Sequence, residues 1–174
     1  MTLRIQMFYS LNINLRTQRG TMARAELIEN LNKALGLELS GVIQYTQHSF
    51  LVTGKDRLVF SDFFRDQAGE AQKHANIVGD KIVALGGVPT VEPAMIRQSI
   101  SLDEMLKQDL ELEREAMAAY MAAWSACDDA DLPQKFWLEG QIADEQMHIE
   151  ELEKITSERK AQAGNERIVL RQIS

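Results

Sequence analysis

Four long stretches of the chain repeat apolar residues every three to four positions, and few helix-breaking residues interrupt them. The 174 residues include only ten glycines and three prolines, and good helix formers such as Ala, Leu, Glu and Lys are abundant. A period of about 3.6 residues is that of an amphipathic α-helix. No stretch shows the strict alternation of a strand, so we expect an all-α protein.

Start and stop signals bound the predicted helices. Gly54-Lys55-Asp56 follows the first helix, Gly86-Gly87 ends the second, and Ser101-Leu102-Asp103-Glu104 opens the third as a capping box. Pro133 lies in the first turn of the fourth helix, where proline is tolerated. The four helices are expected at about residues 23–52, 57–85, 101–127 and 132–163.

The lengths of the connections predict the topology. Short turns join the first helix to the second and the third to the fourth, so each pair should form an antiparallel hairpin. The link at 87–100 is longer, and fully extended it reaches about 45 Å at ~3.3 Å per residue. A helix of about 30 residues has the same length. We therefore expect an up-down-down-up four-helix bundle with one long crossover between helices two and three.

Charge and cysteine content exclude several classes of protein. The 26 acidic residues outnumber the 19 basic ones, which gives a net charge of −7. This balance disfavours nucleic acid as a partner and suits cations. The apolar stretch at 118–127 is shorter than the roughly 20 residues of a membrane span. The single Cys127 excludes an intramolecular disulfide and any four-cysteine metal site, so metal chemistry must rely on carboxylates and three histidines.

The two ends of the chain fall outside the periodic pattern. Residues 1–21 contain three arginines and no acid, which fits either an Arg-rich transit peptide or a variable extension before Met22. We divide the chain into this N-terminal extension, a bundle at 22–163 and a C-terminal tail at 164–174. We expect a cytoplasmic protein.

Each predicted helix places a carboxylate near the middle of its apolar face, and two helices add a histidine. Burying an unpaired carboxylate costs several kcal/mol, and cations at the centre of the bundle would remove that cost. Two divalent irons carry a charge of +4, which four glutamates balance, while two histidines supply neutral nitrogens. Helical di-iron proteins have this arrangement. The predicted metal ligands are Glu38, Glu70, His74, Glu113, Glu145 and His148.

Two further polar side chains lie close to this set in the sequence. Tyr45 follows Glu38 by two turns on the same stripe, so we expect it beside the metal centre, either in catalysis or in core packing. His48 lies outside the set, and we interpret it as a structural histidine, either satisfied or partly exposed.

Three segments that contain these residues resemble the bacterioferritin branch of the ferritin-like superfamily. Residues 31–39 with Gln44-Tyr45 look like the first helix of that family, 109–113 like its third and 144–149 like its fourth. The resemblance implies a ferritin-like bundle in which Glu38, Glu113 and His148 are terminal iron ligands and Glu145 bridges. It also implies a ferroxidase that oxidises Fe(II) with dioxygen or peroxide, for iron storage or detoxification in a homo-oligomeric cage. The expected catalytic residues are Glu38, Tyr45, His74, Glu113, Glu145 and His148.

The second helix departs from the family pattern, Glu-x-x-His-Ala. His74-Ala75 is present, but the bridging position holds Ala71, and Glu70 stands one residue earlier. Glu70 lies about 40° from His74 around the helix, so it either reaches inward as a ligand or leaves one iron position weakened. Bacterioferritins place a haem-ligating methionine where this chain has Gln72, so no haem is expected there.

Two alternatives to an iron-storing cage follow from that departure. One is a non-cage di-iron oxidoreductase that acts on peroxide or an organic substrate. The other is a structural subunit whose metal site is impaired. Manganese or zinc would also suit the predicted ligands.

Overall fold

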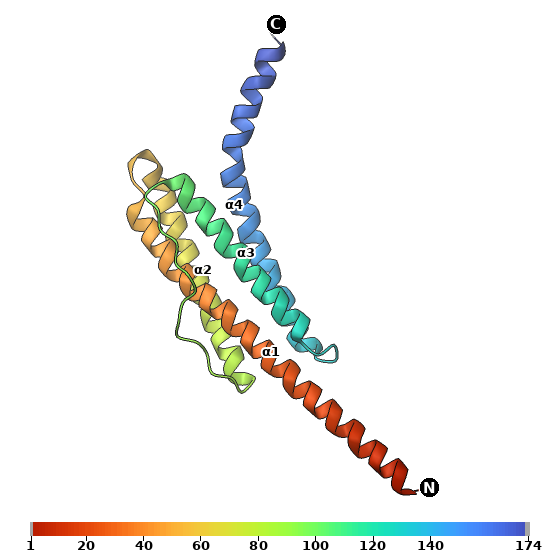
Figure 1. Ribbon diagram of the computed structural model, residues 1–174. Coiled ribbons are helices and arrows are strands. Elements are labelled where there is room, and N and C mark those ends of the chain that lie inside the picture. Colours follow the sequence, from red (N-terminus) through yellow and green to blue (C-terminus); the bar gives the residue numbers. More distant parts are fainter. Residues whose placement is uncertain (1, 173–174) are drawn as a thin grey trace.

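Four long helices make up almost all of the protein (Figure 1). The computed structural model describes the backbone of residues 2–172 and the side chains of residues 20–156. Within that backbone there is no strand, which confirms the prediction of an all-α protein. The elements are α1 (Thr2–Leu51), the 3₁₀ turn η1 (Gly54–Asp56), α2 (Arg57–Ala84), α3 (Leu102–Ala126) and α4 (Leu132–Gln172).

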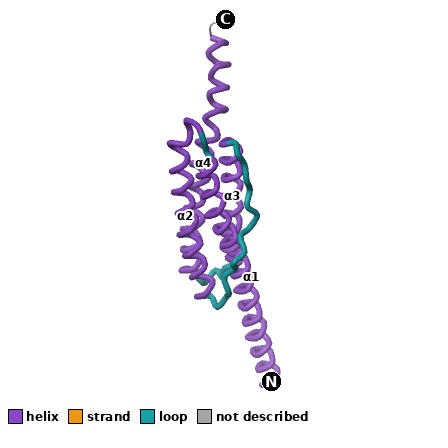
Figure 2. The backbone as a smooth tube through the Cα atoms, turned by 90° about the vertical axis from the view of Figure 1, so that its left-hand side faces the viewer, coloured by secondary structure: helices purple, strands orange, loops and turns teal. Residues whose placement is uncertain are grey.

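The helices form a bundle with one long crossover. α1 and α2 are antiparallel, α3 and α4 are antiparallel, and the link between α2 and α3 runs along the side of the bundle (Figure 2). This is the predicted up-down-down-up order. α1 packs on α2 and on α3, and α3 packs on α4, whereas α2 and α4 have no Cα atoms within 8 Å of each other in the described part of the chain. In the described part of the chain the backbones of the long helices thus pack closely only at α1–α2, α1–α3 and α3–α4.

The first and last helices along the chain, α1 and α4, are longer than the sequence predicts. α1 begins at Thr2 rather than near residue 23, and α4 continues to Gln172 rather than ending near 163. These two ends project from opposite ends of the bundle in Figure 1. The backbone of 2–21 is thus helical, and its role as an extension stays a prediction. Residues 1 and 173–174 of the predicted tails lie outside the described residues.

The predicted glycines end α2, whereas the predicted capping box at the start of α3 does not form. Gly86 has a φ of +82° and its N–H donates to Val83, while the N–H of Gly87 donates to the Ile82 carbonyl at 2.9 Å. This pair of bonds is a Schellman motif, which favours glycine in the left-handed position. Ser101 precedes α3 as its N-cap, although its side chain makes no capping hydrogen bond.

Two further turns are held by side chains. Arg57 Nη1 donates to the Val52 carbonyl at 3.0 Å, so a cation satisfies the carboxyl end of α1. Asp131 Oδ1 accepts the N–H of Gln134 at 3.3 Å, which caps the start of α4. These local contacts hold the two hairpins antiparallel.

Three residues of α1 tie the crossover to the bundle. Asn32 Oδ1 accepts the Thr90 N–H at 2.7 Å, and the Gly36 carbonyl accepts the Ala94 N–H at 2.8 Å. Farther along, Gln44 Oε1 accepts the N–H of Arg97 at 2.8 Å. The extended link is therefore bonded to one helix along its length, and this holds α3 parallel to α2.

The apolar core is divided into two clusters, one toward each end of the bundle. The first includes Leu31, Leu35, Val78, Ile82, Tyr120 and Leu138. The second includes Tyr45, Phe64, Met105, Ile149 and Leu152. On each helix the two sets are separated by a charged or histidine side chain near mid-length. Within the described residues, no helix is long and apolar enough to cross a membrane.

The α2 C-terminus offers a test of this packing. A Cβ on Gly87 would lie 2.7 Å from Ile28 Cγ2 and 2.9 Å from Ile82 Cγ2. Gly87→Ala should therefore lower the free energy of unfolding by about 1–3 kcal/mol. The measurement is urea denaturation of the metal-free protein.

Gly69→Ala is the matched control for this substitution. Gly69 is an exposed residue inside α2, and a Cβ there meets nothing within 4 Å. It should raise stability by up to about 1 kcal/mol because alanine has the higher helix propensity. Equal effects of the two substitutions would contradict the close packing at Gly87.

Candidate metal centre

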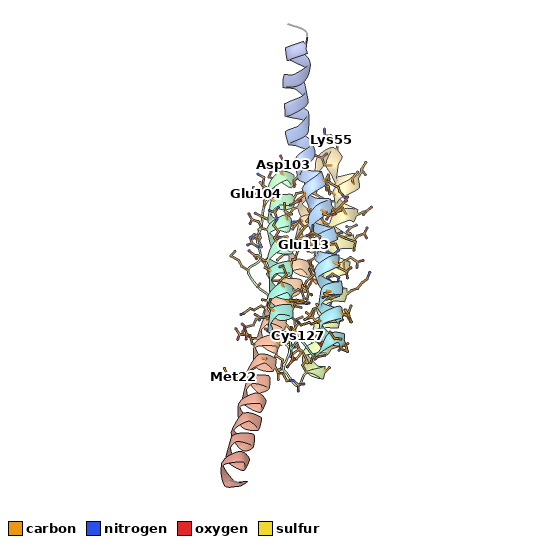
Figure 3. The ribbon with its side chains drawn as sticks, turned by 90° about the vertical axis from the view of Figure 1, so that its right-hand side faces the viewer. Met22, Lys55, Asp103, Glu104, Glu113 and Cys127 are labelled. Carbon is orange, nitrogen blue, oxygen red and sulfur yellow. The ribbon has the colours of Figure 1, made fainter. Side chains whose placement is uncertain are left out.

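Five side chains from all four helices meet at mid-height of the bundle, and we call them the carboxylate–histidine centre. Figure 3 labels Glu113 there, between Asp103 toward one end and Cys127 toward the other. The three carboxylates are buried, and Glu145 is only 1% exposed. The members are Glu38 on α1, His74 on α2, Glu113 on α3, and Glu145 with His148 on α4.

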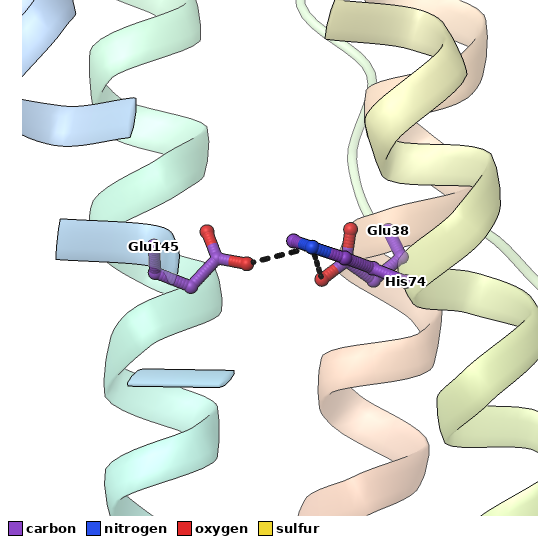
Figure 4. A group of neighbouring side chains, drawn as sticks. All are labelled: Glu38, His74 and Glu145. Carbon is purple, nitrogen blue, oxygen red and sulfur yellow. Dashed lines mark hydrogen bonds and ion pairs between the residues drawn. The ribbon is translucent and has the colours of Figure 1, made fainter. Parts of the chain in front are cut away.

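The centre consists of two overlapping groups that share Glu145. Glu38, His74 and Glu145 offer ligand atoms that lie within 4.8 Å of one another, and so do Glu113, Glu145 and His148. Figure 4 shows the first group, with a Glu145 oxygen and a Glu38 oxygen both directed at the His74 ring. Each group has two carboxylates and one imidazole, so each has the donors of one metal position.

Short distances join the members of each group. His74 Nδ1 lies 3.2 Å from Glu145 Oε1 and 3.5 Å from Glu38 Oε1. His148 Nδ1 lies 3.6 Å from Glu113 Oε2. The two imidazole rings stack with centroids 5.7 Å apart and planes 18° apart. Both histidines thus present Nδ1 to the carboxylates, one histidine in each group.

Two buried tyrosines donate hydrogen bonds to Glu38 and Glu113, the two carboxylates that the groups do not share. Tyr120 Oη on α3 donates to Glu38 Oε1 at 2.7 Å, and Tyr45 Oη on α1 donates to Glu113 Oε1. Burial and the charge of the bonded carboxylate raise the pKa of each phenol well above its usual range. The tyrosines are therefore neutral hydrogen-bond donors. The structure places Tyr45 beside the centre, as the sequence predicts.

Tyr120 is a member of the site that the sequence analysis missed. The sequence spacing could have identified it, since Tyr120 follows Glu113 by seven residues, just as Tyr45 follows Glu38. Seven residues are two helical turns, which keeps both side chains on one face. The phenol of each helix nevertheless bonds the carboxylate of the other helix, a pairing that only the assembled bundle defines.

Protons occupy the centre when metal is absent. Burial lowers the pKa of His74, but hydrogen bonds with Glu145 and Glu38 outweigh it and raise the pKa to about 10. A hydrogen bond with Glu113 raises the pKa of His148 despite its burial. Burial raises the pKa of Glu145 and outweighs the lowering by its hydrogen bond with His74, and the charges of Glu38 and Glu113 raise it further. A metal ion must displace these protons in order to bind.

One carboxylate of the centre is held in its charged form. Burial raises the pKa of Glu113, but hydrogen bonding with His148 and Tyr45 contributes in the opposite direction, and the net shift is downward. Tyr45 and His148 contact different oxygens of this carboxylate, Oε1 and Oε2 respectively. Glu113 is therefore ready to bind a cation at neutral pH.

The residues present fit a pair of metal ions. Glu145 Oε2 is buried and has no hydrogen-bond partner among the described side chains. An unpaired buried carboxylate oxygen is costly, and a bound cation would remove that cost. Carboxylate oxygen and imidazole nitrogen suit iron, manganese and zinc. In such a centre Glu145 would bind both metal ions. One ion would also be held by His74 and Glu38, and the other by His148 and Glu113.

The second helix positions its residues differently from the prediction. Its buried positions are Ser61, Phe64, Ala71, His74, Ala75, Val78 and Ile82. Glu70 lies outside this stripe, with 42% of its side chain exposed, and forms an ion pair with Lys73 at 2.7 Å. Neither metal-capable group among the described residues includes it. Glu70 as a ligand stays a prediction, and Gln72 is exposed with its amide bonded to Asn76.

His48 belongs to a separate buried cluster. Its Nδ1 lies 3.1 Å from Asp109 Oδ2, and Gln44 Nε2 donates to Asp109 Oδ1 at 2.9 Å. All three side chains are fully buried. His48 is therefore fully buried rather than partly exposed and is paired through Nδ1, while its Nε2 is buried with no hydrogen-bond partner among the described residues. Asp109, one turn before Glu113, connects α1 to α3.

The raised pKa values predict how metal affinity depends on pH. At pH 6 the protons held by His74 and Glu145 compete with a metal ion for the same ligand atoms. As the pH rises toward 7.5, these protons are displaced more easily. Zn(II) affinity should therefore increase about tenfold per pH unit for each proton displaced. Calorimetric titrations at pH 6, 6.5, 7 and 7.5 measure the affinity.

The same titrations count the protons directly. Repeating them in two buffers with different heats of ionisation should show net proton release on binding. An affinity independent of pH, with no proton released, would contradict the assignment of protons to the centre.

Comparisons of the sequence identify the relatives of this chain. A model of the Ferritin family, described as a ferritin-like domain, matches residues 28–161. A bacterioferritin of Brucella melitensis biotype 1 (strain 16M) is 36% identical over 134 residues, which cover 74% of this chain and 81% of that protein. The range matched by the family model includes every member of the carboxylate–histidine centre.

Solved structures share the arrangement of the helices. A ferritin-like, diiron-carboxylate protein from Bacillus anthracis str. Ames superposes with a TM-score of 0.74 at 33% identity, over 77% of this chain and 97% of its own. A bacterioferritin from Rhodobacter capsulatus, solved with a metal-free dinuclear site and a haem iron, gives 0.71 at 29% identity, over 79% and 87%.

Proposed function

Since this chain belongs to the ferritin-like family and is a bacterioferritin-like member of it, we propose that it binds two iron ions and oxidises Fe(II) to Fe(III). The proposed role is iron storage or detoxification, in a homo-oligomer of the ferritin type. The relatives named as bacterioferritin and diiron-carboxylate protein support both parts of this proposal. The ligands are Glu38, His74, Glu113, Glu145 and His148.

One observation carries the proposal: two metal-capable groups share a buried carboxylate. Glu145 is 1% exposed, belongs to both groups, and has one oxygen without a hydrogen-bond partner. A carboxylate placed in this way can hold two cations close together. Each Fe(II) gives up one electron, so two adjacent irons supply the two electrons that reduce dioxygen to peroxide, or peroxide to water.

The residues around the iron favour this reaction. Carboxylate oxygens stabilise Fe(III) relative to Fe(II), so an oxygen-rich site makes oxidation easier. Tyr45 and Tyr120 keep Glu113 and Glu38 oriented by hydrogen bonds, so these carboxylates need little rearrangement to bind iron. His74 releases its proton when its Nδ1 binds metal, which moves positive charge out of the buried site as iron enters.

Anaerobic addition of Fe(II), followed by oxygen, tests the function. The wild-type protein should bind Fe(II) and then develop the near-ultraviolet absorbance of Fe(III) faster than buffer alone. Glu145→Gln keeps the size of the side chain but removes the shared anionic ligand, so it should slow the protein-catalysed oxidation at least roughly a hundredfold.

Glu151→Ala is the matched control on the same helix. Glu151 is exposed and ion-paired to Lys154, so its loss should leave oxidation unchanged. Equal rates for wild-type and Glu145→Gln would contradict the proposed site.

Glu70→Ala decides whether Glu70 takes part. In the described structure this carboxylate is bonded to Lys73, so we expect the substitution to change Zn(II) affinity by less than about twofold. The measurement is the calorimetric titration used for the wild-type protein. A loss as large as that of Glu145→Gln would show instead that Glu70 is a ligand, as the sequence suggests.

Ala71 supports a second candidate function. The absent carboxylate at this buried position alters the metal pair, which suits a di-iron oxidoreductase that acts on peroxide or an organic substrate without forming a cage. Light scattering of the iron-loaded protein separates the two. A particle no larger than a dimer, with no mineral core, would favour the oxidoreductase, and a large hollow assembly would favour storage.

A further inference from the structure

The two halves of the bundle contribute matching residues to the centre. Glu38 on α1 corresponds to Glu113 on α3, and each receives a hydrogen bond from the tyrosine of the other helix. His74 on α2 corresponds to His148 on α4, and their rings stack. The centre therefore has the chemistry of a site with approximate twofold symmetry, in which α1–α2 and α3–α4 play equivalent parts.

The symmetry fails at one residue. Glu145 stands three positions before His148, and the equivalent position before His74 holds Ala71. Ala71 is 7% exposed, so its side chain is directed into the protein. A Cβ on Gly41 would lie 3.1 Å from the Ala71 Cβ, which shows that α1 and α2 pack closely there. Glu70 does not restore the missing charge, because Lys73 pairs with it.

The missing carboxylate changes the charge of the loaded centre. Glu38, Glu113 and Glu145 together carry −3 when ionised, and Tyr45 and Tyr120 donate hydrogen bonds to two of them. One divalent ion brings the centre to −1, and a second brings it to +1. A fourth carboxylate would have made the final charge zero. The second ion therefore enters a buried site with too little negative charge to balance it.

The shared ligand adds to this inequality. Both metal positions need Glu145, so the first ion withdraws electron density from the carboxylate that the second ion must also bind. With two bridging carboxylates, this loss of electron density would be spread over both of them. The carboxylate–histidine centre has one shared carboxylate. Glu145 Oε2 has no partner within the described side chains, so it is available to the second ion, although the charge around it is reduced.

We propose that the centre loads its two metals unequally, holding one divalent ion tightly and binding the second only weakly because position 71 lacks a carboxylate. This inference rests on the proposed function and deepens it. One iron position is occupied at low iron concentration, and the second fills only when Fe(II) is abundant. The second iron is then a transient substrate rather than part of a permanent cofactor.

Anaerobic titration with Zn(II), which is not oxidised, tests this inference without any measurement of activity. The wild-type chain should bind one Zn(II) tightly and a second at least about tenfold more weakly. Ala71→Glu adds the missing CH₂ and carboxylate and should strengthen the second step at least about tenfold. Ala71→Gln has the same size without the charge, and its two steps should match the wild type.

A chemical complement covers the case in which Ala71→Glu does not fold. Ala71 with an acetate ion has the atoms of a glutamate side chain, so millimolar acetate added to the wild-type protein should strengthen the second Zn(II) step. Acetamide, which has no charge, is the control and should have no effect. Thermal melts of each variant show whether it folds.

The possible outcomes separate the inference from the function. Two equally tight Zn(II) steps in the wild type would overturn the inference and leave the proposed function standing. If Ala71→Gln strengthened the second step as much as Ala71→Glu, packing rather than charge would be the cause, and the inference would also fail. If Zn(II) bound no more tightly to the wild type than to Glu145→Gln, the proposed function would fall together with it.

Discussion

The structure depends on how three buried carboxylates are kept charged, or kept protonated, in the middle of an apolar bundle. Glu38, Glu113 and Glu145 lie between two hydrophobic clusters, where an unpaired charge would destabilise the fold. In the metal-free chain that cost is reduced by protons and by hydrogen bonds, which come from the histidines and from Tyr45 and Tyr120. Metal ions can replace those protons without any new arrangement of the helices.

The packing of the helices reflects this constraint. α2 and α4 do not approach each other closely in the described part of the chain, and the His74–Glu145 contact crosses the gap between them. The close contacts are elsewhere, at α1–α2, α1–α3 and α3–α4. A metal ion between α2 and α4 would therefore join the two hairpins where backbone packing does not, so metal binding should couple directly to the stability of the bundle.

Much of this protein could be predicted from the sequence because its signals are local. Apolar periodicity, the glycines after α2 and the length of the crossover determine the number and direction of the helices, and Glu-x-x-His in α4 places two ligands on one face. Helix two was harder to predict. Glu70 lies about 40° from His74 around the helix and Ala71 about 60° from it on the other side, so apolar periodicity alone does not decide which of the two faces inward. Packing against Gly41 decides in favour of Ala71.

By itself the sequence determined an all-α bundle with one crossover, because helical periodicity and residue type are properties of each helix alone. It also predicted an acidic centre of Glu38, Glu70, Glu113 and Glu145 with two histidines. The tertiary structure alone decided which tyrosine bonds which glutamate, that His48 pairs with Asp109, and that Ala71 rather than Glu70 is buried on α2. These outcomes follow from contacts between helices far apart in the chain. They depend on how each helix is rotated against its neighbours, and only the packed core sets that rotation.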